Sequence, residues 1–301
     1  MTVGPWGELS IRGACVAAEG VGYAYPGGVN ALTAVDFCAE SGDFMAIMGA
    51  NGGGKSTLMK LLVGLLHPSR GEVRIDDLVV SPEHFAEVTS TVGYLFQDPN
   101  DQLFCATVGD DIAYGPENLG LTDPDVRRRV EWAAQTCGVG DLLDRPIHAL
   151  SYGQKKRVAL AGVLAMAPRV LVLDEPTASL DPMAEAALMR LLRTLNEQGL
   201  TIIMATHDVD LIPLYAHKIT LLRQGNVVAY GPLEQVFRES VHLEGCDLRL
   251  PRIAYLFDIF LEDDQRPLTV GQARKALVRM VELGRLDLVP ILLRDQTGVA
   301  G

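Results

Sequence analysis

Several features that mark other classes of protein are missing from this sequence. Its 301 residues carry 38 acidic and 26 basic side chains, which gives a net charge of −12. Binding nucleic acid requires a basic face toward the phosphate backbone, and the basic triplet Arg127–Arg129 is instead typical of a solvated helix face. We therefore expect no nucleic-acid partner.

The sequence contains few cysteines, and a charged residue or a proline interrupts each long apolar stretch. The cysteines are odd in number and lack metal-ligand spacing, which indicates incidental thiols in a reduced cytosolic protein; they are Cys15, Cys38, Cys105, Cys137 and Cys246. The first residues lack the basic start and apolar run of a signal peptide. The most apolar stretch, 158–172, is broken by Pro168 and Arg169, so we expect no membrane-spanning helix. A membrane process would then require a membrane partner.

What the chain does contain is an alternation of apolar strands and helices. Strands are predicted at 16–25, 44–48, 91–96, 170–173 and 201–205, with a hairpin at 71–80. Helices are predicted at 56–66, 151–166 and 182–198, the last with Asp181 as N-cap and Pro182 in its first turn. Residues 107–137 are predicted to be helical, with a break at 120–124. This order predicts an α/β fold with a parallel sheet covered on both faces and a helical insertion.

The nucleotide motifs described below stop at about residue 238, which suggests a division of the chain. We expect a flexible N-terminus at 1–13, a main domain at 14–238 and a small C-terminal helical domain at 239–301. The C-terminal domain is predicted to hold two helices, at 252–261 and 270–281. The first carries an apolar stripe, which would contact a second copy of the chain or pack on the main domain; it comprises Ile253, Leu256, Phe257 and Phe260.

A glycine-rich loop follows the strand at 44–48. Residues 49–57 fit the pattern G-x-x-x-x-G-K-[ST], in which backbone N–H groups close around phosphates and the next helix adds its positive end. Lys55 is predicted to reach the β- and γ-phosphates and Ser56 to ligate Mg²⁺. We expect ATP and Mg²⁺ to bind here, and the nucleotide-binding residues are Gly49, Asn51, Gly52, Gly54, Lys55, Ser56 and Thr57.

Two further motifs give the loop its context. The apolar strand at 170–173 ends in Asp174, as in the strand that holds Mg²⁺ in phosphate-loop ATPases, and Glu175 follows. About twenty residues earlier, Leu150-Ser-Tyr-Gly-Gln154 leads into a basic helix. With Pro-Thr-Ala-Ser-Leu-Asp at 176–181, this order resembles the ATP-binding cassette family over residues 14–238.

The resemblance implies a fold and an assembly. The fold is a cassette with a parallel core sheet, an antiparallel β subdomain and a helical subdomain at about 98–166. Two copies of the chain would close head-to-tail around two ATP molecules. Each chain would then supply half of each active site.

The resemblance also implies the catalytic roles. Glu175 would polarise the attacking water as general base, and His207 would contact the γ-phosphate and stabilise the transition state. Gln97 would sense Mg²⁺ and water and link them to the transport partner. Ser56, Gln97 and Asp174 would form the Mg²⁺ site.

Residues 150–154, which we call the signature turn, would serve the ATP bound by the partner chain. Ser151, Gly153 and Gln154 match the family there, while Tyr152 stands where the family usually has Gly. Asp181 would contact the nucleotide across the dimer.

An aromatic side chain near the loop would stack on adenine in this family. Tyr25 and Tyr23 compete for that role, and we prefer Tyr25 because it ends its strand next to the turn at 26–28. A tyrosine on a strand is otherwise most often a packing residue.

Two segments, 96–104 and 151–165, look like those of the importers of the energy-coupling-factor group, and most like their cobalt-type ATPase, which is usually a homodimer. The chain would then lie on the cytoplasmic face of the cell membrane as a peripheral subunit. It would dock on a transmembrane coupling protein and act indirectly on a membrane substrate-binding subunit. Gln102, Leu103 and Phe104 are the predicted docking residues, with Leu103 and Phe104 in the core as the alternative.

Other readings remain open at this point. A nickel or vitamin importer of the same group, or a conventional importer cassette, fits the same motifs, and the sequence does not separate a homodimer from a heterodimer. A non-transport cassette ATPase is disfavoured by the single cassette and the acidic charge. A non-hydrolysing nucleotide-binding regulator is disfavoured by the intact Glu175 and His207.

Overall fold

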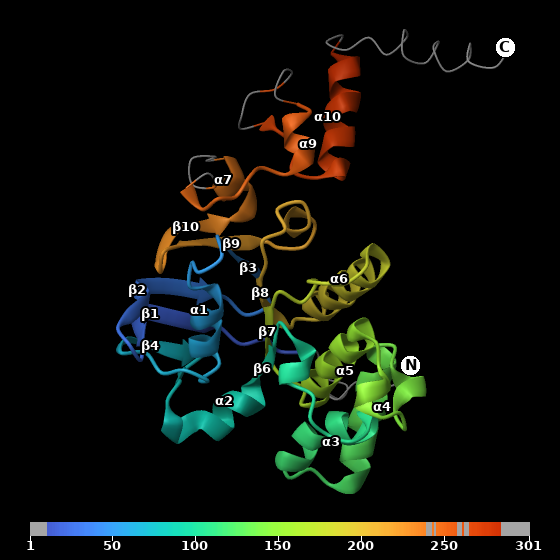
Figure 1. The fold of residues 1–301 in the computed structure, drawn as a ribbon. Coiled ribbons are helices and arrows are strands. Elements are labelled where there is room, and N and C mark those ends of the chain that lie inside the picture. The colour runs from blue at the N-terminus through green and yellow to red at the C-terminus, as the bar shows by residue number, and fades with distance from the viewer. Residues whose placement is uncertain (1–10, 239–242, 244, 258–260, 262–264, 284–301) are drawn as a thin grey trace, which may run out of the picture.

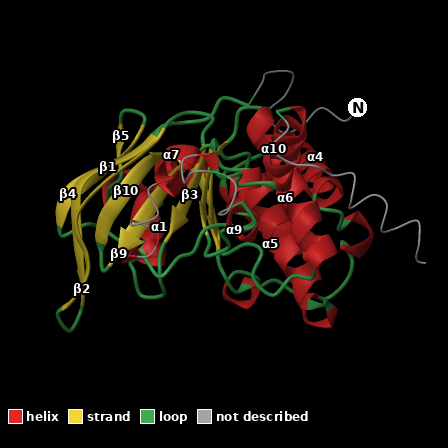
Figure 2. Ribbon diagram, turned by 90° about the horizontal axis from the view of Figure 1, so that it is seen from above, coloured by secondary structure: helices red, strands yellow, loops and turns green. Residues whose placement is uncertain are grey.

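The structure is a computed structural model that describes residues 11–238, 243, 245–257, 261 and 265–283. In this part of the chain, a mixed central sheet is flanked by an antiparallel sheet on one side and by a group of helices on the other (Figures 1 and 2). The α/β cassette fold expected from the sequence is thus confirmed.

The central sheet has the strand order β10-β9-β3-β8-β7-β6. Its strands are β3 (Phe44–Met48), β6 (Val92–Leu95), β7 (Val170–Asp174), β8 (Thr201–Ala205), β9 (Lys218–Arg223) and β10 (Asn226–Pro232). All neighbours are parallel except β9 and β10. Every residue of β3, β7 and β8 is buried, as parallel strands covered on both faces should be. Parallel strands bring their carboxyl ends to one edge, so the segments that follow β3, β6, β7 and β8 meet there.

The second sheet is antiparallel, in the order β2-β1-β4-β5. It comprises β1 (Val16–Tyr25), β2 (Val29–Ala39), β4 (Arg70–Ile75) and β5 (Leu78–Val79), the last two forming the predicted hairpin. Helix α1 (Lys55–Leu62) packs between the sheets, and its Leu58, Leu61 and Leu62 share one buried cluster with Val21 of β1 and Ile47 of β3. This packing holds the glycine-rich loop between two rigid sheets.

The helical subdomain consists of α3 (Val108–Asn118), α4 (Asp123–Thr136) and α5 (Tyr152–Ala165), which pack on one another. Helix α6 (Pro182–Glu197) lies beside them, and α2 (Phe85–Thr91) precedes β6 (Figure 1). Buried side chains of α3, α4, α5 and α6 join those of β3, β7 and β8 in a second core cluster. The break predicted near residue 120 is confirmed, because Gly120 has a φ of +73° and no helix continues through it.

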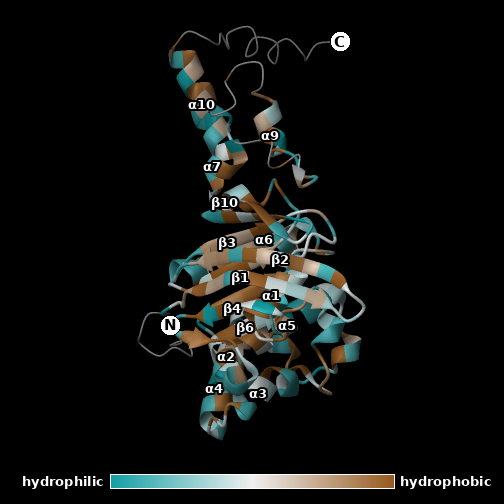
Figure 3. Ribbon diagram, turned by 90° about the vertical axis from the view of Figure 1, so that its left-hand side faces the viewer, coloured by the Kyte–Doolittle hydropathy of each residue, from teal (hydrophilic) through white to brown (hydrophobic). Residues whose placement is uncertain are grey.

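The C-terminal part contains α7 (Leu233–Arg238), α9 (Arg252–Tyr255) and α10 (Val270–Glu282). Helices α9 and α10 extend from the cassette beyond α7 (Figures 1 and 3). They share a small core of Phe257, Ala273 and Met280, with Ile253 packed against it. The predicted apolar stripe therefore packs partly on α10, while Leu256 stays 67% exposed; Phe260 lies outside the described residues.

Some elements differ from the prediction for local reasons. Helix α1 ends at Leu62 and not at residue 66, because Gly64 has a φ of +76° that a helix does not accept. The sequence patterns did not predict β2, β9, β10 or α2. Strand β2 alternates buried and exposed residues irregularly and pairs with β1 through register shifts, so its pattern has no clear period of two.

Candidate active site

The glycine-rich loop joins β3 to α1 and is fixed by close backbone contacts. A Cβ on Gly49 would lie 2.1 Å from the carbonyl oxygen of Leu222, and one on Gly54 would lie 2.9 Å from that of Ala31. Gly49 and Gly54 also have φ values of +150° and +104°, which side chains disfavour. The loop's curvature therefore needs glycine at both positions.

Lys55 begins α1 and points back over the loop. Its side chain is buried, and Nζ donates to the carbonyl oxygens of Gly49 at 2.8 Å and Ala50 at 3.2 Å. The N-terminus of α1 adds unpaired backbone N–H groups at the same place. A buried ammonium group beside a helix N-terminus is suited to an anionic ligand such as a phosphate.

Asp174 ends β7 and is 5% exposed. The hydroxyl of Tyr94 on β6 donates to its Oδ2 at 3.2 Å, and the hydroxyl of Ser56 is also hydrogen-bonded to the carboxylate. Burial raises the pKa of Asp174, and these two hydrogen bonds oppose the rise. Hydroxyl and carboxylate oxygens next to a phosphate-binding loop are the hard donors that Mg²⁺ prefers, so Ser56 and Asp174 fit such an ion.

Glu175 follows at the end of the strand in a left-handed conformation, with φ +45°. Its Oε2 accepts from Nε2 of Gln97 at 3.3 Å, and its Oε1 lies 3.4 Å from Nδ1 of His207. The structure therefore brings together the three residues predicted to be catalytic, and we call Gln97, Glu175 and His207 the catalytic cluster. Backbone strain at a glutamate in such a cluster is a common feature of functional sites.

The buried side chain of Lys156 is hydrogen-bonded to the segment that begins at Glu175. It is 2% exposed, and its Nζ donates to the carbonyl oxygens of Glu175 at 3.0 Å and Ala178 at 3.1 Å. Burial lowers the pKa of Lys156 to about 8, against the raising effects of Glu175, Asp98 and Asp174.

The signature turn lies at the start of α5. Ser151 Oγ accepts from the Gln154 backbone N–H at 3.3 Å, and Gln154 Oε1 accepts from the Ser151 N–H at 2.9 Å, which forms a capping box. Asp181 is the N-cap of α6, and its side chain accepts from the N–H groups of Met183 and Ala184 at 2.9 Å each. The predicted N-cap role of Asp181 is confirmed.

The two halves of the predicted nucleotide site line different cavities. Gly49, Asn51 and His207 line one of about 690 Å³, which Arg249 and Arg252 also border. Ser151, Gly153, Gln154 and Asp181 line another of about 400 Å³ between α5 and α6. Within one chain, the signature turn and the glycine-rich loop thus face separate spaces.

Tyr25 lies at the edge of the glycine-rich loop. Its hydroxyl is 3.1 Å from Thr57 Oγ1, and the residue is 37% exposed. Tyr23 meets it edge-on, with ring centroids 5.0 Å apart, and packs against the core between the sheets. Of the two candidates, Tyr25 is the one whose ring borders the loop.

The predicted docking residues need a correction. Leu103 is 9% exposed and belongs to the core, and the side chain of Gln102 is used internally, accepting from the Phe96 N–H at 3.1 Å and donating to the Ala159 carbonyl oxygen at 3.3 Å. Phe104 alone stays exposed, at 65%, and its ring meets that of Tyr114 edge-on at 4.7 Å. Only one member of the predicted patch is therefore free to contact a partner.

Sequence reasoning missed Tyr94 and Lys156. Tyr94 is paired in register with Val172 and sits one strand from Asp174, a relation that depends on the order of β6 and β7 in the sheet. Lys156 stands in a basic triplet, 155–157, that is typical of a solvated face. No local signal in the sequence separates Lys156 from its two neighbours.

Three comparisons place the chain among known proteins. Residues 32–178 match the family model described as ABC transporter. A putative ABC transporter ATP-binding protein of Methanothermobacter marburgensis is 44% identical over 87% of this chain and 97% of its own length. The energy-coupling factor transporter ATP-binding protein EcfA of Methanococcus maripaludis is 42% identical over 86% of this chain and 96% of its own length.

Solved structures agree with these relatives. The structure of cbiO1 from Clostridium perfringens, described as part of the ABC transporter complex cbiONQ, is 41% identical, with a TM-score of 0.69 over 83% of this chain and 100% of that one. A dimeric ATP-binding cassette in a post-hydrolysis state, bound to ADP and Pi, is 28% identical, with a TM-score of 0.67 over 72% of this chain and 98% of that one.

Fold and site together define an ATPase of the ATP-binding cassette class. The chain belongs to the ATP-binding proteins of ABC transporters and, within them, to those of the energy-coupling factor type. Its enzymatic activity is the hydrolysis of ATP that drives transport. In the residues that the structure describes, no helix has both the length and the apolar character needed to cross a membrane.

Proposed function

We propose that this chain is the ATP-hydrolysing subunit of an importer for cobalt ions and that it works as a head-to-tail dimer. The observation that carries the proposal is the catalytic cluster beside the glycine-rich loop, with the signature turn facing a different cavity. The similarity of residues 96–104 and 151–165 to the cobalt-type ATPase supports cobalt over nickel or a vitamin. In the cell the subunit would lie on the cytoplasmic face of the membrane, bound to membrane partners.

ATP binding would begin at the glycine-rich loop. Lys55 Nζ exchanges its two loop carbonyls for the β- and γ-phosphates, and the N–H groups of the loop and of the first turn of α1 surround the phosphates. Tyr25 stacks on the adenine from the loop's edge. Ser56 and Asp174 would hold Mg²⁺, which when bound offsets the charge of the phosphate oxygens.

The signature turn of the second chain would then close over the γ-phosphate. The Ser151 hydroxyl and the Gly153 N–H donate to its oxygens, and Asp181 lies at the same interface. The N-terminus of α5 favours a negative charge there. Neither chain alone supplies both sets of donors.

Hydrolysis would follow within the catalytic cluster. Glu175 Oε2, which Gln97 holds at 3.3 Å, takes the proton of the attacking water, and His207 donates to the γ-phosphate oxygens. Phosphoryl transfer needs mainly positioning and charge stabilisation, which these residues supply. Loss of the bridging phosphate reopens the dimer, and the segment after Gln97 passes this movement to the membrane partner.

A Glu175→Gln variant tests this mechanism. It keeps the hydrogen-bonding shape of the cluster but cannot take a proton, so it should bind ATP, form a stable dimer and lose turnover by about a hundredfold or more. Sedimentation with and without ATP, together with phosphate release, measures both effects. Near-normal turnover would remove Glu175 from the role of general base.

Uptake of radiolabelled cobalt tests the substrate. The chain and its co-purifying membrane partners, reconstituted in vesicles with ATP at the chain's side, should accumulate cobalt, and the Glu175→Gln complex should not. Uptake of nickel or of a vitamin in place of cobalt would change the substrate while keeping the ATPase subunit.

Since Leu103 is buried and Gln102 is hydrogen-bonded within the chain, the docking patch for the membrane coupling protein must consist of other residues. We propose that it is formed by Phe104 and Tyr114, whose exposed rings meet on the helical subdomain, which follows Gln97 in the chain. Phe104→Asp should weaken assembly with the coupling protein, whereas Leu65→Asp, at an exposed apolar residue after α1, should not. Full assembly of the Phe104→Asp variant in detergent pull-down would refute this placement.

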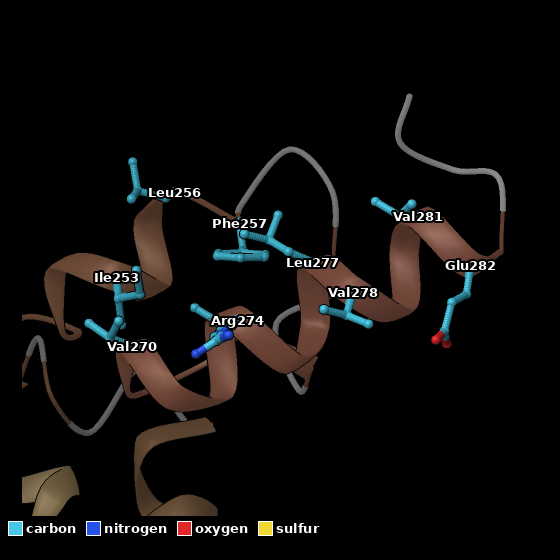
Figure 4. A pocket seen from close by; sticks show the side chains of 10 residues that line it. Ile253, Leu256, Phe257, Val270, Arg274, Leu277, Val278, Val281 and Glu282 are labelled. Carbon is cyan, nitrogen blue, oxygen red and sulfur yellow. The ribbon is translucent and has the colours of Figure 1, made fainter. Parts of the chain in front are cut away.

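We also propose the boundaries 14–238 for the cassette and 239–301 for an accessory domain that contacts the second copy. An apolar groove of about 690 Å³ between α9 and α10 supports this role, with Leu256, Leu277 and Val278 along it (Figure 4). Deleting residues 239–301 should weaken dimer formation at a given protein concentration. Unchanged dimerisation would reject the contact.

A further inference from the structure

The signature turn and the catalytic cluster of one chain are joined by a residue that the mechanism above does not use. The Tyr152 hydroxyl donates to the backbone carbonyl oxygen of Gln97 at 3.3 Å. The same Gln97 donates through its side chain to Glu175 Oε2. Gln97 is therefore held at its backbone carbonyl by the signature turn and at its side-chain amide by Glu175.

A second contact runs parallel to the first. The ammonium group of Lys156 lies 5.8 Å from the centre of the Tyr152 ring, and that group donates to the Glu175 carbonyl oxygen. The residue before it, Lys155, donates from Nζ to Asn100 Oδ1 at 2.8 Å. The start of α5 is thus attached to the segments that carry Gln97 and Glu175, two members of the catalytic cluster.

We propose that Tyr152 is a positioning residue that couples the two ATP sites of the dimer. Its ring and hydroxyl link the signature turn, which serves the partner's ATP, to Gln97 and Glu175, which serve the chain's own ATP. When ATP draws Gln97 and Glu175 into their reactive arrangement, the Gln97 carbonyl moves the signature turn with it. Occupancy of one site then favours closure of the other. This proposal rests on the head-to-tail dimer proposed above.

The residue type supports a specific role. Glycine, the family's usual residue at this position, has no side chain with which to reach Gln97. A tyrosine in a half-buried turn gives a ring for Lys156 and a hydroxyl for a carbonyl 55 positions away in the chain. The capping box between Ser151 and Gln154 already begins α5, so Tyr152 is not needed to form the helix.

A Tyr152→Phe variant isolates the hydroxyl, since the ring and its contact with Lys156 remain. The matched control is Tyr230→Phe, which removes another hydroxyl bonded to a backbone carbonyl, that of Cys38 at 3.0 Å, far from the cluster in sequence and on β10. The full-length proteins are compared for ATPase rate as a function of ATP concentration and for ATP affinity at dilutions where they are monomeric.

Positive coupling predicts a Hill coefficient above 1, up to about 2 for two sites, in the wild type and in Tyr230→Phe. Tyr152→Phe should lower it toward about 1, because one neutral hydrogen bond is worth roughly a two- to tenfold change in coupling. The ATP affinity of its monomer should be unchanged. A merely structural role would lower the rate or the stability and leave the Hill coefficient where it was.

Two results would overturn the proposal. One is a Tyr152→Phe Hill coefficient equal to that of the wild type, and the other is a wild type that hydrolyses ATP with a coefficient of 1. If the wild type itself fails to dimerise or to hydrolyse ATP, the proposed function fails, and the wild-type measurements show this independently of Tyr152. Both results leave the dimer mechanism intact, because a dimer whose two sites are not coupled can still hydrolyse ATP.

Discussion

The two halves of the nucleotide site differ in how far a single chain completes them. The first half, which contains the glycine-rich loop and Asp174, is complete within one chain. Lys55 is buried in it, and the carbonyl oxygens of Leu222 and Ala31 lie close against the loop. Two hydroxyl groups are hydrogen-bonded to Asp174. The second half, which contains the signature turn, is exposed at Ser151. The side chains of Ser151 and Gln154 are hydrogen-bonded to backbone N–H groups at the start of α5. The first half is therefore a preformed anion site. The second half is the N-terminus of a helix, which in the proposed dimer would contact the ATP bound by the partner chain.

This difference is what the proposed head-to-tail dimer requires. In that dimer, the preformed phosphate site would bind ATP without the partner, whereas hydrolysis would need the donors of both halves. Because the second half is carried by a separate subdomain, the proposed pair would open and close without disturbing the buried first half. The following changes test that division, from the largest expected effect to the smallest.

Lys55→Ala should abolish the function of the first half, which is to bind the phosphates of ATP. The ammonium group is the buried cation of the loop, so its loss should weaken ATP binding by the isolated chain and reduce hydrolysis by about a hundred- to thousandfold. Titration with a fluorescent ATP analogue and a phosphate-release assay measure both. Normal ATP affinity of the variant monomer would break the comparison.

Ser151→Asp should disable only the second half. Aspartate is as good an N-cap as serine, so α5 should stay folded, while the added charge repels the γ-phosphate of the partner's ATP. ATP binding by the monomer should be normal, and hydrolysis should fall by about a hundredfold. Ser151→Asn, a neutral cap, is the matched control and should lose clearly less. Because aspartate and asparagine both cap a helix as well as serine does, equal losses in both variants would mean that the added charge does not act on the partner's γ-phosphate.

Tyr94→Phe should loosen Asp174 without removing it. The hydroxyl that donates to Oδ2 at 3.2 Å fixes one carboxylate oxygen, and loss of such a supporting bond lowers metal affinity by about tenfold. The Mg²⁺ concentration needed for half-maximal ATP binding measures the change. An unchanged Mg²⁺ requirement would show that Ser56 and the strand end position Asp174 by themselves.

Lys156→Met should change the dependence of stability on pH. The folded-state pKa of about 8 lies below the ordinary value of 10.5, so between these values the unfolded chain binds more protons. The free energy of unfolding should therefore rise as the pH rises from about 8 to 10.5, and this contribution should vanish in the variant. Urea denaturation across that range measures the slope, with Lys155→Met as the control that should keep it.

The sequence was most informative where a motif follows a strand. The loop at 49–57, Asp174 with Glu175, and His207 each follow a buried strand, and a parallel sheet brings such positions to one edge. Prediction failed where the outcome depends on packing between distant segments. Whether Leu103 or Phe104 is buried depends on how residues 96–104 lie on α5, and Tyr94 gains its role from the neighbour that β6 has in the sheet.

The same limit applies to Tyr152. Its departure from glycine is visible in the sequence, but its partner, the carbonyl oxygen of Gln97, is a backbone atom that every residue carries. Only the approach of α5 to the end of β6 shows which carbonyl it reaches.

The most direct test of the central claim is to mix two inactive proteins, Lys55→Ala and Ser151→Asp. If each site combines one chain's loop with the other's signature turn, both homodimers are inactive, while every mixed dimer contains one intact site. The mixture should then recover up to about a quarter of wild-type ATP hydrolysis, since about half of the dimers are mixed and each has one working site of two. A mixture no more active than its separate components would contradict the account, because it would mean that both halves of a site come from one chain.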